Sequence, residues 1–159
     1  MKNKIRHRIF IIVIMAVMLS MLPFFSFNKE KIYIYTQTEH PTKSETKLIE
    51  EVQQKNFKVI INSSLWPEEK SYGLWFKDSP DIEKIQQSKA NINFVYTEVF
   101  AAIEWKRLVK PIVIITPYRE LYEHYIRSNI PTVQAKLGRD FTADRLIEVL
   151  NWIKQNQKY

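Results

Sequence analysis

Residues 111–116 read Pro-Ile-Val-Ile-Ile-Thr, which is the clearest strand pattern in the chain. Four consecutive β-branched aliphatic residues are typical of a strand that is buried on both faces. Strands of this kind occur almost only in parallel sheets that helices cover from both sides. The stretch therefore predicts an α/β domain with a parallel sheet at its centre.

Stretches before and after it also have the length and composition of strands. They are residues 31–36, 57–62, 92–96 and 131–135. Each predicted strand is followed by a helix or a helical connection, which indicates a single three-layer domain of Rossmann-like or flavodoxin-like type. We expect about five mostly parallel strands within residues 28–159, with right-handed crossovers and, by preference, the strand order 2-1-3-4-5.

The expected helices begin at recognisable signals. Thr42 and Glu45 have the spacing of a capping box, and an apolar stripe at helical period follows over residues 48–52. The last helix is expected from Thr142. Further helix starts are predicted at Ser79-Pro80, at Thr97 ahead of residues 98–109, and at Thr116-Pro117.

Residues 65–78 form a long connection that interrupts this alternation. Leu74–Phe76 can form a small extra strand within it. Two other interpretations stay open: the aromatic residues of the connection cover the sheet, or they form a lid or a partner-docking loop. The candidate partner-binding residues are Trp66 and Trp75 in this connection and Tyr118 and Tyr122 on a later helix.

A membrane segment is predicted ahead of this domain. Residues 1–8 are a basic tail, and residues 9–27 contain no charged residue. As a helix this run is roughly 28 Å long, close to the thickness of the hydrocarbon core of a bilayer. We therefore expect an uncleaved transmembrane signal anchor. A cleaved signal peptide and a buried core helix are the alternatives, although Phe24 and Phe25 crowd the place where a cleavage site needs small side chains.

The basic residues also predict an orientation. Four Lys or Arg precede the apolar run, whereas only Lys29 and Lys31 follow it closely. The positive-inside tendency keeps the N-terminus in the cytoplasm. The chain is then expected to cross the cell membrane once, with the domain on the outer side. The net charge of +7 includes four basic and no acidic residues within 1–27, so much of it is explained by this tail. The net charge therefore does not indicate nucleic-acid binding, and no nucleic-acid partner is expected. The predicted anchor implies a membrane partner, and we also expect a protein partner in the envelope.

The composition excludes several classes of site. The chain has no cysteine, which rules out disulfides, thiol nucleophiles and thiolate metal sites. It has two glycines, where an average usage of about 7% would give roughly eleven. Phosphate-binding loops need glycines for close backbone approach, so no nucleotide cofactor is expected. The histidines are not clustered with other ligand types, and no metal site is predicted.

Polar residues follow each predicted strand, where ligands of open parallel sheets bind. The weak catalytic candidates are Glu39, His40 and Glu98. The ordinary alternative is that these turns only need hydroxyl groups to cap helices. The ligand-binding candidates are Thr36, Thr38, Ser63, Thr97, Thr116, Lys136 and Arg139.

The patterns of two known families bear on these positions. Thr116 and Lys136 stand at strand ends as in response-regulator receivers, but no acidic pair follows the first strand and no aspartate follows the third, so that family is excluded. Residues 92–118 resemble the strand–helix–strand of the nucleotide-sugar half of two-domain glycosyltransferases, in which an acidic residue before the helix and a Lys-Pro or Gly-Pro before the next strand recur. This local resemblance implies that Glu98 faces a cleft.

Three functions follow from these observations. The preferred one is a membrane-anchored, non-catalytic binding or accessory protein of the cell envelope. The second is a glycosyltransferase-like or other enzyme of envelope glycan metabolism. The third is a subunit of a membrane transport, secretion or conjugation complex, in which the anchor packs against other helices.

Overall fold

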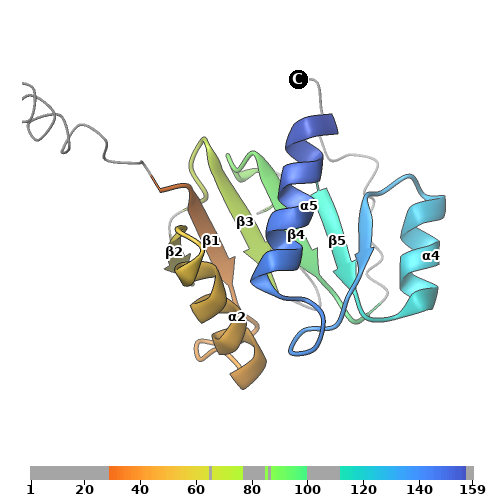
Figure 1. The fold of residues 1–159 in the computed structure, drawn as a ribbon, viewed down its shortest axis with the longest axis horizontal. Helices are drawn as coiled ribbons and strands as arrows, with labels where there is room; N and C mark the ends of the chain where they lie inside the picture. Colours follow the sequence, from red (N-terminus) through yellow and green to blue (C-terminus); the bar gives the residue numbers. More distant parts are fainter. Residues whose placement is uncertain (1–28, 65, 77–84, 86, 100–111, 157–159) are drawn as a thin grey trace, which may run out of the picture.

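The computed structural model describes residues 29–64, 66–76, 85, 87–99 and 112–156. Six strands form one sheet in which every pair of neighbours is parallel, in the order β2-β1-β3-β4-β5-β6 (Figure 1). The strands are β1 (Lys31–Tyr35), β2 (Lys58–Ile61), β3 (Ser71–Trp75), β4 (Ile92–Tyr96), β5 (Ile112–Thr116) and β6 (Thr132–Gln134). The described helices are α2 (Lys43–Gln54), α4 (Arg119–Arg127) and α5 (Ala143–Asn156).

Alternating side chains of the central strands enter two separate apolar clusters. One cluster packs against α2 and α5 and includes Ile34, Leu74 and Phe94 from three neighbouring strands. The other lies on the opposite face, where Val95 and Ile114 pack with residues of α4. Because β3, β4 and β5 are buried along their whole length, the sheet is covered on both faces. The prediction of a three-layer α/β domain of Rossmann-like type is thereby confirmed.

The predicted number and order of strands need correction. Five of the six strands match the predicted stretches to within one or two residues, and β3 is additional. The interpretation of 65–78 that allowed an extra strand at Leu74–Phe76 was closest, but the strand begins earlier, at Ser71. β3 lies between β1 and β4, so the strand at 92–96 does not pair with the first strand as the order 2-1-3-4-5 required. The succession of the other five strands across the sheet is as predicted.

The start of α2 confirms the capping box. The Thr42 hydroxyl accepts a hydrogen bond from the backbone of Glu45, and the Glu45 carboxylate accepts one from the backbone of Thr42. The predicted start of α4 at Thr116-Pro117 was two residues too early, because the N-cap is Tyr118. The predicted helix start at Ser79-Pro80 and most of the helix predicted at 98–109 lie outside the described residues.

The two edges of the sheet have different surroundings. β1 begins, and α5 ends, at the edge where the strands start, which is called the amino edge below (Figure 1). The strands end at the opposite, carboxyl edge. The predicted membrane segment at 9–27 lies outside the described residues, and within the described ranges no helix is both long and apolar enough to cross a membrane.

Candidate functional site

The chain changes direction across the sheet between β1 and β3. β1 connects through α2 to β2 on one side, whereas β3 is followed by β4, β5 and β6 on the other side. In open parallel sheets, ligands bind outside the carboxyl ends of the strands at such a reversal. A ligand site is therefore expected among the residues that follow β1 and β3.

Asn62, directly after β2, organises the loop that follows β1. Its Oδ1 accepts a hydrogen bond from the backbone N–H of Thr36 (2.9 Å), and its Nδ2 donates to the Thr36 hydroxyl (2.7 Å). That hydroxyl in turn donates to the carbonyl of Thr38 (2.6 Å). Asn62 has a φ of 44°, in the left-handed region that asparagine tolerates better than most residues. The loop is thus held by a side chain from the neighbouring strand.

A cavity of about 370 Å³ lies at this reversal, within the size range of small-molecule sites. Its apolar lining is aromatic: the rings of Tyr35 and Trp75 stack with centroids 4.0 Å apart and planes 11° apart. Trp66 also lines it and leaves 40% of its surface exposed. The polar lining consists of Thr36, Gln37, Thr38, Glu39, Asn62, Ser63 and Ser64.

The ionisable groups of this first cavity are few. Burial, with a smaller contribution from Tyr33, raises the pKa of Tyr35 to about 12, so its phenol is neutral at physiological pH. Among the described lining residues Glu39 is the one carboxylate, and no lysine, arginine or histidine is included. The cavity therefore offers hydroxyl, amide and aromatic groups with a single negative charge.

A second cavity of about 510 Å³ lies between the start of α2 and the ends of β4 and β5. Gln37 lines both cavities. The hydroxyl of Tyr96 donates to Glu98 (2.7 Å) and accepts from the backbone N–H of Leu137 (3.1 Å). Burial raises the pKa of Tyr96 well above its ordinary value. The second carboxylate in this lining, Glu45, is engaged in the cap of α2.

The structure brings together only some of the predicted ligand residues. Thr36, Thr38 and Ser63 meet in the first cavity, together with the catalytic candidate Glu39. Thr97 and Thr116 are buried, and their hydroxyls bond to the backbone of the turns that follow, at Val99 and Tyr118. The two hydroxyls thus stabilise these turns, but Thr116 does not cap α4, whose N-cap is Tyr118.

The remaining candidates lie apart. Lys136, Arg139 and His40 are exposed and do not belong to the described lining of either cavity, whereas Glu98 lines the second one. Tyr118 is 48% exposed beside Glu98, and Tyr122 is half-buried on α4. Trp75 requires a correction: it is 1% exposed within β3, because the pairing of β3 between β1 and β4 buries it, so it is not part of an exposed docking loop.

Asn62 and Tyr35 were not predicted as site residues. An asparagine immediately after an apolar strand is a signal for a left-handed turn position, and this signal was available for Asn62. The role of Tyr35 depends on its stacking against Trp75, which only the pairing of β1 with β3 creates. Within the described ranges, no cluster of three or more acidic or histidine side chains is arranged to hold a metal ion.

Neither the known family models nor the curated proteins nor the solved structures contain a match to this chain.

Proposed function

We propose that this chain is a membrane-anchored binding protein of the cell envelope, which acts by contact and not by catalysis, and that the first cavity holds its ligand. The observation that carries the proposal is the position of Trp66. The half-exposed indole ring of Trp66 lies beside several hydroxyl and amide groups at the reversal between β1 and β3. This is the place in a parallel sheet where a ligand is expected.

The chemistry of the lining favours a neutral, hydroxyl-rich ligand such as a saccharide. A pyranose ring has an apolar face of C–H groups, which packs on an aromatic side chain such as Trp66, and hydroxyls around its rim. The Gln37 amide offers both a donor and an acceptor, and the Glu39 carboxylate accepts two hydrogen bonds or more. A phosphorylated ligand is disfavoured, because the described lining has one carboxylate and no cationic side chain.

Catalysis in this cavity is disfavoured by the same lining. Hydrolysis of a glycosidic bond ordinarily uses a pair of carboxyl groups, and acyl transfer uses a nucleophile beside a base. Among the described lining residues one carboxylate is present, and the hydroxyl of Thr36 is committed to Asn62 and Thr38. The location in the envelope rests on the uncharged run at 9–27 and the basic residues before it.

The test is a titration of the full-length chain in detergent with neutral saccharides, starting with oligomers of N-acetylglucosamine. Trp66→Ala should weaken binding about tenfold or more, since it removes the stacking surface. The matched control is Trp152→Ala, which removes the other strongly exposed tryptophan of the described residues (60% exposed) from outside the cavity. Equal affinities for the two variants, or no binding of any neutral saccharide, would contradict the assignment of the cavity.

The second candidate is an enzyme of envelope glycan metabolism that uses Glu98. It is favoured by one observation: Glu98 accepts a hydrogen bond from the phenol of Tyr96 at the rim of the larger cavity. If Glu98 were catalytic, Glu98→Gln would abolish turnover of a sugar donor while leaving the melting temperature nearly unchanged. Turnover that persists in Glu98→Gln would contradict a catalytic role for Glu98.

A further inference from the structure

Beyond ligand binding, we infer that the amino edge of the sheet is a docking surface for the anionic headgroups of a phospholipid bilayer. The inference rests on the proposed membrane anchor, because the chain enters the domain at this edge through Lys29 and Glu30. It adds that one side of the domain contacts the lipid, so that the domain has a fixed orientation relative to the bilayer.

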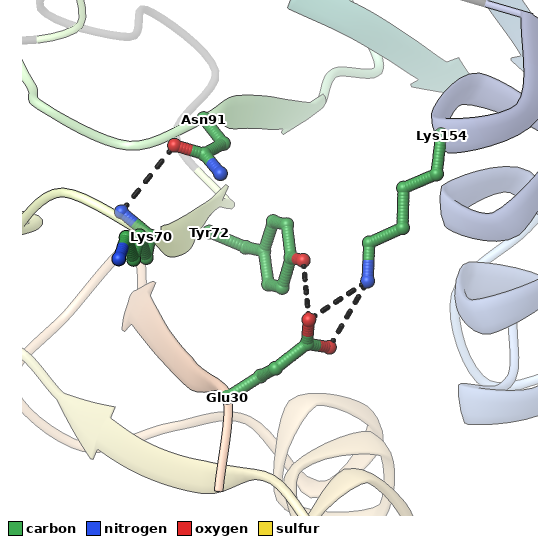
Figure 2. Close-up of polar contacts among 5 residues, drawn as sticks. All are labelled: Glu30, Lys70, Tyr72, Asn91 and Lys154. Atoms are coloured by element: carbon green, nitrogen blue, oxygen red, sulfur yellow. Dashed lines mark hydrogen bonds and ion pairs between the residues drawn. The ribbon is translucent and has the colours of Figure 1, made fainter. Parts of the chain in front are cut away.

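Side-chain contacts of Glu30 fix the point at which the chain enters the domain. The carboxylate of Glu30 accepts hydrogen bonds from the hydroxyl of Tyr72 (2.9 Å) and from the ammonium group of Lys154 (2.8 and 3.1 Å) (Figure 2). The Lys154 ammonium also lies 5.2 Å from the centre of the Tyr72 ring. The residue before β1 is thereby joined to β3 and to the end of α5, which holds the entry point of the chain at this edge.

The amino edge carries an excess of basic side chains. Around the starts of β1 to β4 and the end of α5, six lysines stand against three glutamates. The lysines are Lys29, Lys31, Lys58, Lys70, Lys89 and Lys154, and the glutamates are Glu30, Glu68 and Glu69. Lys31 is paired with Glu68, and Lys154 with Glu30. The other four lysines are exposed and form no ion pair within the part of the chain that the structure describes.

The carboxyl edge has the opposite balance. Along the described loops that follow the strands and the first turns of the helices, five basic residues stand against six acidic ones. The basic residues are Lys43, Arg119, Lys136, Arg139 and Arg145, and the acidic ones are Glu39, Glu45, Glu98, Glu120, Asp140 and Asp144. A negatively charged membrane surface attracts clustered lysines and repels carboxylates, so this asymmetry orients the domain with its amino edge toward the lipid.

An exposed aromatic residue lies at the same end of the molecule. Trp152 lies one turn before the end of α5 and is 60% exposed. It lines an apolar cavity of about 410 Å³ together with Val113 near the start of β5 and Thr132 at the start of β6. Tryptophan is enriched where proteins meet the headgroup region, because its ring is apolar and its N–H is polar. A basic edge with a tryptophan beside it is a surface suited to an anionic bilayer.

The test uses the full-length chain in vesicles, and it exploits the absence of cysteine. Single cysteines are introduced as Lys89→Cys at the amino edge and as Glu120→Cys at the carboxyl edge, and each is labelled with a fluorophore. The vesicles contain phosphatidylcholine, with or without phosphatidylglycerol, and a lipid with a quencher on its headgroup. We expect several-fold stronger quenching at position 89 than at 120 in the anionic vesicles. The difference should shrink in phosphatidylcholine alone and at about 1 M salt, where charges are screened beyond about 3 Å.

Charge reversal supplies the matched comparison. Lys58→Glu combined with Lys70→Glu should abolish the extra quenching, whereas Lys43→Glu combined with Lys47→Glu on α2 changes the net charge equally and should preserve it. Trp152→Ala should reduce the quenching at position 89 and leave saccharide binding intact. Circular dichroism checks that each variant is folded.

Two results would overturn the inference. One is quenching that is equal at positions 89 and 120, or that does not respond to lipid charge. The other is a chain that alkaline carbonate removes from the vesicles, which would also disprove the anchor. Saccharide titration on the same vesicles separates these failures from a failure of the proposed ligand site.

Discussion

Asn62 and Thr36 are joined by two hydrogen bonds of opposite direction across 26 residues of sequence, one from the Thr36 backbone to Asn62 Oδ1 and one from Asn62 Nδ2 to the Thr36 hydroxyl. This relationship links the ends of β2 and β1 and shapes the loop that lines the first cavity. Asn62→Ala removes both bonds and places alanine at a positive φ, so we expect unfolding to become easier by about 1–3 kcal/mol. Urea denaturation measures the change.

Asn62→Gly separates the two causes. Glycine adopts a φ of 44° without strain, so this variant loses only the hydrogen bonds and should be less destabilised than Asn62→Ala. Both variants should weaken saccharide binding, because the loop that carries Gln37 and Glu39 is no longer held. If glycine and alanine were equally destabilising, backbone strain would have no part in the effect.

Gly73 is required by the packing of β3 against β4. A Cβ atom at this position would lie 2.5 Å from Oδ1 of Asn93 and 2.7 Å from Nε1 of Trp75, and both side chains are buried and hydrogen-bonded to each other. We therefore expect Gly73→Ala to lower the free energy of unfolding by about 1–3 kcal/mol. Ser64→Ala, on the exposed loop after β2, is the control and should be within about 0.5 kcal/mol of the unchanged chain. A melting temperature for Gly73→Ala equal to that of the control would show that the pair can move aside.

Because of Tyr35, we expect the stability of the protein to depend on pH in the alkaline range. In the unfolded chain a tyrosine releases its proton near pH 10, whereas burial raises the pKa of folded Tyr35 to about 12. Between these values the unfolded state binds fewer protons, so stability falls as the pH rises. Tyr35→Phe keeps the ring against Trp75 and should lose less stability over this window. Urea denaturation at several pH values tests this, and parallel curves for the two chains would count against it.

The predicted topology can be tested in cells. If the N-terminus is cytoplasmic and the domain lies outside, protease added to spheroplasts should digest the domain, and a cytoplasmic marker protein should survive. Carbonate extraction should leave the full-length chain in the membrane fraction. A protected domain would reverse the orientation, and recovery of the chain in the soluble fraction would disprove the anchor.

Much of the fold was predictable because its signals are local. The apolar runs of β4 and β5 and the capping box of Thr42 and Glu45 depend on neighbouring residues in the sequence. β3 was predicted only as one alternative. Its residues, Ser-Tyr-Gly-Leu-Trp, include a glycine and follow a polar segment, which is typical of a loop, and only pairing with strands on both sides makes them a buried strand.

The candidate site was predicted less completely for a related reason. Thr36, Thr38 and Ser63 were identified because they follow strands, but which strand ends lie side by side depends on strand order. The insertion of β3 moved the reversal and gave Trp75 a packing role beside Tyr35. It also separated Glu98 from Glu39, which line different cavities.

The shortness of the strands has a consequence for where the protein can meet its ligand. β1 and β3 have five residues each, and a strand rises about 3.3 Å per residue, so the two edges of the sheet are roughly 17 Å apart. With one edge resting on the headgroups, the opening beside Trp66 would stand only that far above them. Such a protein would meet its ligand only in the thin zone next to the bilayer.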